Sequence, residues 1–575
     1  MFVRGLRSAW RPYARACWTS SALAGGGIAA YTISSNAWND AREIPPPTEH
    51  RFPLCSVQAW GSNRNKVAAP QKNKATVNVP LEMPAFDGVA LRDLQLSETY
   101  GAAVDAHGDV VQWGLGFSDE LDPKTSLTPQ RTLTGKDIVR VQLCGPKIYA
   151  LSRSGAIYVF ASQRIHQLVP TSWLNKLPGA AASIDYVKLS PMQGSRSASA
   201  SFVAIAAGEH HLLALAKNGS VWSVPVDEHA NAYGQLGYTR TTINAASASD
   251  AHKVQPIDWR LEPKVVARSP AGGAAEVPLD DLPAGSVWVP PSSIRFATQI
   301  RPVPSLDGVV FAQIAAGLEH SVVRTPEGRV LAWGRNANGE LGLGAGVHID
   351  TVAVPSEVTW PRSVVGKNAQ CTNVAAGSNN TFFVVQSTGA PEETVPEAAR
   401  ALASVQQRID VLAVGAGQRG TLGNAQRNQL SNVPARVRTV SGLQEYSEAA
   451  RAMTPIPVRS LSVGTDGQVA VVMDAPPVGD ETRRDVYVWG ANDQYQLGLG
   501  KRSNLAMPAL LTLSPEGDEA ARNAPVLNRV LLVERQKVPG KAYDPHGNGT
   551  QRAYHVEQDI VAGGQGMAVY GRIVL

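Results

Sequence analysis

Two pairs of adjacent titratable residues are the first candidates for chemistry in this sequence. His210 precedes His211, and Glu319 precedes His320. Imidazole and carboxylate groups side by side are common in general acid–base catalysis and in metal ligation. Both His211 and His320, however, lie three residues after the Gly of an Ala-Ala-Gly tripeptide. A catalytic pair is rarely copied together with its surroundings, so we predict structural hydrogen bonding here and no catalytic, metal or cofactor site.

Other motifs and the charge balance argue in the same direction. No phosphate-binding loop, nucleophile elbow or zinc-protease motif occurs. The four cysteines are too far apart for a zinc site and are expected to be buried thiols: Cys17, Cys55, Cys144 and Cys371. Residues 1–40 hold four of the 53 basic and one of the 48 acidic side chains, which leaves 49 and 47 for the rest. A body this close to neutral makes nucleic acid an unlikely class of partner.

The residues around His320 belong to an internal repeat. Residues 311–334 and 202–225 share the Ala-Ala-Gly, the His and a turn Gly eight residues after the His, Gly328 and Gly219. Apolar residues alternate or cluster on each side of that turn, as they do in paired strands. Five further, weaker copies start at residues 94, 139, 371, 458 and 555.

The last copy is divided between the two ends of the chain. Residues 555–571 supply a first half, and residues 55–63 supply the missing second half. A closed ring explains the division, whereas an open solenoid would need polar capping repeats. We therefore predict an all-β fold, a seven-bladed β-propeller whose N- and C-terminal strands share one blade.

Each second half carries a Trp-Gly pair and then a Leu-Gly turn, or variants of them. We predict that the Trp ends an inward-facing strand and fills the space between sheets. The Gly permits close approach or positive φ, and the turn Leu fills the corner of the core. Replacement of the first turn Gly by Tyr495 indicates that this position tolerates a Cβ. The predicted repeat positions are Trp60, Gly61, Trp113, Gly114, Gly208, His211, Gly317, His320, Trp333, Gly334, Leu341, Gly342, Gly377, Leu422, Gly423, Trp489, Gly490, Leu497, Gly498 and Gly563.

The stretch from Ala315 to Gly344 resembles the repeat of the regulator of chromosome condensation family, whose members form seven-bladed propellers. The resemblance extends over most of residues 54–575. Together with the lack of catalytic motifs, it leads us to expect a non-enzymatic propeller without a cofactor that presents loops to protein partners in mitochondria. Fungal mitochondrial members are inner-membrane proteins tied to assembly of respiratory complex III. Animal mitochondrial members are linked to ribosomes and guanine-nucleotide exchange, and the nuclear founder exchanges nucleotide on a small GTPase and binds chromatin.

The N-terminus has the composition of a mitochondrial targeting segment. Residues 1–15 contain four Arg, aromatics and no acid, as a mitochondrial presequence does. Residues 16–39 carry no charge and are long enough for one transmembrane helix in the inner membrane, although Gly25–Gly27 and several hydroxyl residues weaken it. A cleavage region followed by a linker is the alternative. Residues 40–53 read as an extended linker.

The body, residues 54–575, is longer than seven minimal blades require. The surplus lies in five insertions: residues 169–201, 238–300, 386–407, 474–484 and 513–553. Long connections are usually functional or lack fixed structure, and residues 238–300 read as able to fold back on a blade or to grip a partner. We expect a scaffold or assembly factor for an inner-membrane complex, with a nucleotide exchange factor or a mitochondrial ribosome assembly factor as alternatives. The propeller is expected on the intermembrane side if residues 16–39 span, and in the matrix if they are cleaved.

Overall fold

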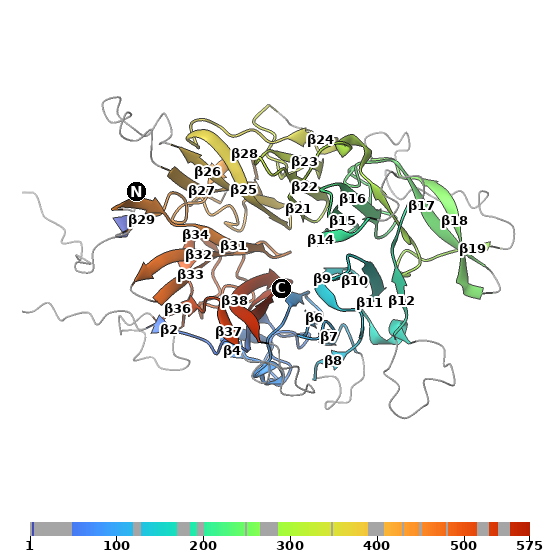
Figure 1. The fold of residues 1–575 in the computed structure, drawn as a ribbon, viewed down its shortest axis with the longest axis horizontal. Helices are drawn as coiled ribbons and strands as arrows, with labels where there is room; N and C mark the ends of the chain where they lie inside the picture. Colours follow the sequence, from blue (N-terminus) through green and yellow to red (C-terminus); the bar gives the residue numbers. More distant parts are fainter. Residues whose placement is uncertain are drawn as a thin grey trace, which may run out of the picture.

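The computed structural model is an all-β ring of seven sheets around a central axis (Figure 1). It describes residues 3–4, 49–118, 128–168, 184–192, 200–247, 250–264, 286–346, 349–388, 407–427, 430–447, 451–478, 481–513, 528–538 and 553–575. In these ranges the helices are all short 3-10 turns: η2 (Pro84–Phe86), η3 (Arg164–Gln167) and η6 (Pro304–Leu306). The predicted seven-bladed propeller is confirmed.

The blades are antiparallel sheets built from consecutive strands, listed from the channel outwards. Blade 1 has β5 (Asp93–Leu96), β6 (Gly101–Val104), β7 (Val110–Trp113) and β8 (Gln130–Arg131), and blade 2 has β9 (Ile138–Cys144), β10 (Lys147–Ser152), β11 (Ile157–Ala161) and β12 (Tyr186–Lys188). Blade 3 has β14 (Phe202–Ala207), β15 (His211–Ala216), β16 (Val221–Pro225), β20 (Gln299–Pro302) and the parallel edge strand β13 (Ser190–Pro191). Blade 4 has β21 (Gln313–Ala316), β22 (His320–Arg324), β23 (Val330–Arg335) and β24 (Thr351–Glu357).

Blades 5, 6 and 7 have longer strands, and blades 6 and 7 also have additional ones. Blade 5 has β25 (Lys367–Gly377), β26 (Asn380–Thr388), β27 (Gln407–Ala416) and β28 (Leu430–Arg436). Blade 6 has β31 (Val458–Val463), β32 (Gln468–Val478), β33 (Glu481–Gly490) and β34 (Leu505–Leu510), with β36 (Asn528–Leu532) also on β33, β35 (Thr512–Leu513) on β36, and β2 (Glu49–His50) on β36. Blade 7 has β38 (Tyr554–Gly563), β39 (Gly566–Val574), β3 (Val57–Ser62) and β4 (Thr76–Glu82), with β37 (Gln536–Val538) on β38.

Blade 7 joins the two ends of the propeller. β3 pairs antiparallel with β39, in a register that sets Val57 opposite Tyr570 and Trp60 opposite Met567. The pairing confirms that the split repeat closes the ring, and closure removes the free edges that an open array would expose.

The second strand of each blade lacks the alternation of apolar and polar residues that a half-buried strand shows. Every residue of β15, His211–Ala216, is buried, because neighbouring sheets cover both of its faces. A short continuous apolar run is the expected pattern for such a strand. The Trp residues also differ from their predicted location. Trp333 lies on β23, the third strand from the channel, and not on an inward-facing strand.

Several insertions are structured. Residues 238–300 fold back on blade 3 through the sheet β18–β17–β19, formed by β17 (Arg240–Ser247), β18 (Asp250–Arg260) and β19 (Ser286–Trp288). Ile243, Trp259 and Phe296 join the core of that blade. Residues 474–484 extend the β32–β33 hairpin, and strands β36 and β37 lie within residues 513–553. Most of residues 169–201 and 386–407 lie outside the described residues.

The expected linker is partly built into the body. β2 pairs with β36, Phe52 is buried, and the Gln558 side-chain amide donates to the carbonyls of Phe52 and Pro53 at 3.2 and 2.9 Å. Sequence analysis did not predict this pairing, because the partner strand β36 lies in an insertion far along the chain. Apart from Val3–Arg4 (β1), the presequence and residues 16–39 lie outside the described residues, within which no helix is long and apolar enough to cross a membrane.

Candidate functional site

In blades 1, 4, 6 and 7 the Trp of the repeat binds the blade to the preceding one in the ring. Trp333 of blade 4 is fully buried and donates from Nε1 to the backbone carbonyl of Gln235, in the Leu-Gly turn of blade 3, at 2.9 Å. The equivalent bonds run from Trp489 to Thr421, from Trp60 to Gln496 and from Trp113 to Val67, at 2.7, 2.8 and 2.9 Å. A buried indole N–H must find an acceptor. Here the acceptor belongs to the preceding sheet in the ring.

The glycines around this contact are required by space and by conformation. Gly334, which follows Trp333, has φ +108°, and a Cβ there would lie 2.6 Å from the Glu319 carbonyl oxygen. Gly498 has φ +68°, and its Cβ would lie 2.7 Å from Nε1 of Trp60. The remaining Trp-Gly and Leu-Gly glycines share positive φ: Gly61, Gly114, Gly342, Gly423 and Gly490. The turn leucines Leu341, Leu422 and Leu497 are fully buried.

The Ala-Ala-Gly glycines lie where neighbouring inner strands approach closely. A Cβ on Gly208 would lie 2.6 Å from the Gly317 carbonyl oxygen, and one on Gly377 would lie 2.6 Å from that of Val463. On Gly563 it would lie 2.3 Å from the Leu96 carbonyl oxygen, and on Gly317 it would meet the ring of His320.

The two repeat histidines form hydrogen-bond chains between blades. Nε2 of His211 lies 3.0 Å from Oγ of Ser321, which donates to the Gln235 carbonyl at 2.9 Å. Nε2 of His320 lies 2.9 Å from Oγ1 of Thr381, which donates to the Glu340 carbonyl at 2.6 Å. Because each hydroxyl has one proton and gives it to a carbonyl, its oxygen accepts from Nε2–H.

Burial keeps both rings neutral. It lowers the pKa of His211 and of His320 to about 3, with a smaller effect from neighbouring positive charge. Neither Nδ1 has a hydrogen-bond partner. The two rings also lie in different blades, each bound to the following sheet, and the structure does not bring His320 and its neighbour Glu319 together as an acid–base pair. Glu319 instead binds Arg335 at 2.6 Å.

The same strand position holds other residue types in other blades, and sequence comparison missed them. Like His320 opposite Gly334, Lys147 pairs with Ala161 and Gln468 with Gly490. Lys147 donates from Nζ to the Val226 carbonyl of blade 3 at 2.6 Å, and Gln468 donates to the Gly564 carbonyl of blade 7 at 2.8 Å. Tyr100, which precedes β6, donates to Gly145 of blade 2 at 3.3 Å. What these residues share is their position in the strand register, opposite the glycine of the Trp-Gly pair or its replacement.

Lys147 is an unusual member of this series because it is almost fully buried. Burial lowers its pKa to about 8, and nearby Cys144 and Asp227 oppose that shift. Burial likewise raises the pKa of the Cys144 thiol, whose Sγ donates to the Gly208 carbonyl at 2.9 Å. The thiol is therefore protonated and unreactive at neutral pH.

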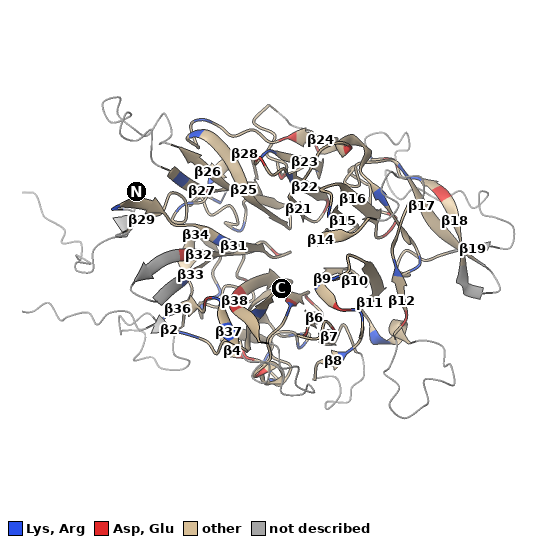
Figure 2. Cartoon of the chain, in the orientation of Figure 1, with Lys and Arg blue, Asp and Glu red and all other residues tan. Residues whose placement is uncertain are grey.

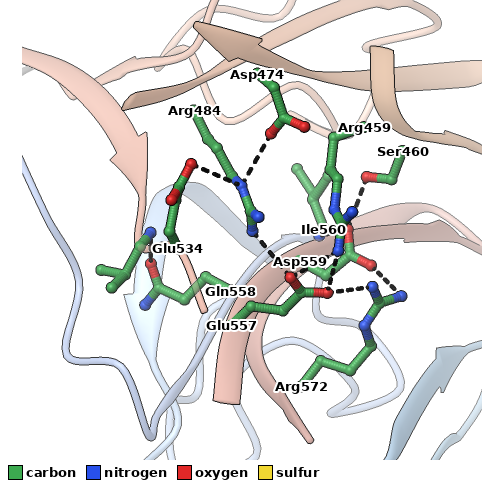
Figure 3. A network of polar contacts seen from close by, with 11 residues as sticks. Arg459, Ser460, Asp474, Arg484, Glu534, Glu557, Gln558, Asp559, Ile560 and Arg572 are labelled. Atoms are coloured by element: carbon green, nitrogen blue, oxygen red, sulfur yellow. Dashed lines mark hydrogen bonds and ion pairs between the residues drawn. The ribbon is translucent and has the colours of Figure 1, made fainter. Parts of the chain in front are cut away.

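The junction of blades 6 and 7 carries a network of charged side chains (Figure 3). Three arginines converge on the buried carboxylate of Glu557: Arg459 donates to both oxygens at 2.9 and 2.8 Å, Arg572 at 2.5 Å and Arg484 at 3.2 Å. Asp559 binds Arg572 at 2.6 Å and accepts from Ser460 at 2.8 Å. Burial opposes ionisation of Glu557, but hydrogen bonds from Arg572 and Arg459 outweigh it and lower its pKa to about 2.

These groups bind the blades to one another. Within the described ranges, no three His, Cys, Asp or Glu side chains are grouped so that they could hold a metal ion. The fold and its contacts define a seven-bladed β-propeller held by side chains that cross between sheets.

Comparison with known proteins identifies the repeat. The regulator of chromosome condensation (RCC1) repeat matches residues 311–340, 327–384 and 485–520. The chain thus contains RCC1 repeats, with matched residues in blades 4, 5 and 6, and the arrangement of its blades also occurs in solved structures. Yeast RCC1 (Prp20), bound to Kap60, superposes with a TM-score of 0.51 at 14% identity over 97% of each chain. Human WBSCR16 gives 0.51 at 14% identity over 91% of this chain and 100% of its own.

Two of the similar sequences are named as mitochondrial proteins. FMP25 of Saccharomyces cerevisiae is 21% identical over 530 residues, which cover 88% of this chain and 75% of FMP25. The RCC1 domain-containing protein RUG3 of Arabidopsis thaliana is 25% identical over 305 residues, 52% of this chain and 53% of RUG3. The ultraviolet-B receptor UVR8 of the same plant is 24% identical over 51% of each chain. The chain thus spans about half the length of UVR8 and RUG3.

Proposed function

We propose that this propeller is a non-enzymatic scaffold of mitochondria that binds proteins during assembly of an inner-membrane respiratory complex. The alignment with FMP25 carries the proposal, because it covers 88% of this chain and 75% of a protein named as mitochondrial. Complex III is the first candidate, from the resemblance to fungal inner-membrane members.

The N-terminal region supports this location. Residues 1–15 serve as the presequence and residues 16–39 as a single membrane anchor in the proposal. In the structure β1 pairs in parallel with β29 (Gln444–Ser447), which forms a hairpin with β30 (Ala452–Pro455). A span would separate β1 from the propeller by the membrane, so that pairing and the anchored state exclude each other. Carbonate extraction tests the anchor, and protease treatment of mitoplasts tests on which side the propeller lies.

The side chains singled out by sequence are occupied with structural contacts. His211 and His320 are buried and bind the next blade. In the part of the chain that the structure describes, basic and acidic residues are interspersed around the ring (Figure 2), whereas nucleic acid favours a one-sided basic face. Partner binding through loops and edges is the function that this leaves best supported.

A cross-linked pull-down of the full chain from mitochondria is the decisive experiment. Enrichment of subunits or assembly factors of one respiratory complex supports the proposal, and enrichment of ribosomal proteins supports the ribosome alternative. The exchange-factor alternative rests on the resemblance to the family, and Prp20p of Saccharomyces cerevisiae, which shares this fold, binds Gsp1p and histones. Accelerated nucleotide release from a mitochondrial GTPase by the purified chain would favour it over a scaffold.

A further inference from the structure

The N-terminal segment enters the propeller at a fixed point on the outer edge of blade 6. β2 continues that sheet by pairing Glu49 with Arg529 and His50 with Val530. Residues 51–56 then lead directly into β3 of blade 7. Any tether that precedes residue 49 therefore leaves from the edge shared by blades 6 and 7, across the ring from blades 2 and 3 (Figure 1).

The tether is short. If residues 16–39 span the membrane, as proposed above, ten residue steps separate Asn39 at the membrane surface from Glu49 on the propeller. Fully extended chain covers at most ~3.6 Å per residue, so this distance is at most about 35 Å. Such a tether keeps the edge of blades 6 and 7 close to the membrane. Blades 2 and 3, on the opposite side of the ring, then lie farther from the membrane.

The exposed charged side chains that the structure describes at this edge are basic. Among residues 50–53 and 529–538, the exposed charged side chains are Arg51, Arg535 and Lys537. Gln558 gathers their backbone segments, because its side chain binds the Phe52 and Pro53 carbonyls and accepts from the Val533 amide at 2.9 Å. The acid of this stretch, Glu534, lies 3.9 Å from Arg484 in the network of Figure 3 and is only 30% exposed.

We propose that the edge formed by residues 50–53 and 529–538, called here the basic edge, docks on an anionic lipid surface. The inference rests on the proposed membrane anchor for its tether and on Arg535 and Lys537 for its charge. Docking fixes the propeller edge-on to the bilayer, so that the two ring faces remain open to protein partners.

Site-specific photo-cross-linking of the full chain tests the basic edge. p-Benzoylphenylalanine replaces Lys537 or, as the control, the exposed Arg362 after the outer strand of blade 4. The chain is reconstituted in phosphatidylcholine vesicles with or without 20% cardiolipin. Lipid adducts at position 537 at least severalfold above those at position 362 are expected, and equal yields would overturn the proposal. In mitochondria, adducts from position 537 to a protein instead of lipid would also overturn it.

Charge reversal separates the basic edge from the anchor. One basic residue near an anionic surface is worth ~1 kcal/mol, so removing its charge should weaken contact of the edge with a cardiolipin surface about fivefold. An inserted anchor by itself keeps the chain on the vesicle, so the readout is the yield of lipid adducts from position 537. Arg535→Glu should lower that yield severalfold with an unchanged melting temperature, and Arg362→Glu should not. A chain that carbonate extracts but whose adducts still depend on Arg535 refutes the anchor and keeps the basic edge. Resistance to carbonate with no effect of Arg535→Glu on the adducts refutes the basic edge alone.

Discussion

Nε1 of Trp60 donates to the carbonyl of Gln496 at 2.8 Å, across 436 positions of the sequence. The bond joins β3 of blade 7 to the Leu-Gly turn of blade 6. Together with the pairing of β3 and β39, it makes the stability of the C-terminal blades depend on residues near the N-terminus.

Truncation tests this dependence. Deleting residues 1–64 removes β2 and β3 and should lower the melting temperature of the whole propeller, because blade 7 loses a central strand and Trp60. Deleting residues 1–39 removes nothing from the ring and should leave the melting curve unchanged. The two proteins are compared by circular dichroism. Identical melting temperatures for both would contradict closure through blade 7.

Replacing Trp333 measures the inter-blade contact. Trp333→Ala should lower the free energy of unfolding by about 3–5 kcal/mol, the usual range for a buried aromatic side chain. Trp333→Phe keeps much of the packing and should cost less than the Ala variant, since the Gln235 carbonyl still accepts from Ser321. Urea unfolding followed by fluorescence gives both values. A Phe variant as unstable as the Ala variant would show that the hydrogen bond, and not burial, dominates.

The neutral histidines predict a loss of stability in mild acid. The folded-state pKa of His320 is about 3, below the ordinary value of 6.5, so the unfolded chain binds the proton more readily. Its contribution is complete above pH 6.5 and falls by up to ~1.4 kcal/mol per pH unit as the pH drops toward the folded pKa. His320→Gln, which copies Gln468 of blade 6, should make stability less dependent on pH between 6.5 and 5. Equal slopes for the two proteins would contradict the assignment of a neutral, buried ring.

Tyr495 is expected to be a strained residue. It occupies the turn position that is Gly234, Gly339 and Gly420 in other blades, and it has φ +62° where those glycines have φ +77° to +79°. The sequence-based interpretation that a Cβ is tolerated here was therefore incomplete, because the backbone stays left-handed and costs roughly 1–2 kcal/mol.

Tyr495→Gly should consequently raise the free energy of unfolding by up to about 1 kcal/mol, less whatever is lost from the contact of the ring with Arg502. The opposite change, Gly339→Ala, should destabilise, since a Cβ there would lie 2.6 Å from Cα of Asn432. Thermal unfolding of the two variants side by side measures both effects. A destabilised Tyr495→Gly protein would mean that the aromatic ring contributes more than the strain costs.

The propeller was predictable from sequence because its determinants recur. Closure of the ring can be predicted from the sequence alone. One repeat is divided between the half that contains Trp60 and the half at residues 555–571, at opposite ends of the chain. The blade-to-blade hydrogen bonds were not predictable in the same way. Lys147 and Gln468 occupy the strand position of His320 but are different residue types. Only the strand register therefore reveals that they too make a hydrogen bond to the following blade.

Docking of residues 49–53 escaped prediction for a different reason. Its receptor is β36, which lies in an insertion without repeat character and pairs in parallel with β2. The charged network around Glu557 likewise combines residues of blades 6 and 7 that have no shared motif. Such contacts depend on how insertions fold, which local patterns do not encode.

The split blade also governs the order in which the molecule can mature. A chain that enters an organelle N-terminus first delivers β3 early, yet its partner β39 is the last strand to arrive. Until then the apolar faces of β3, including Trp60, have no sheet to cover them, and blade 6 lacks one neighbour. If the chain is imported as proposed, it must therefore be kept from aggregating until β39 has entered, because blade 7 can fold only at the end of translocation.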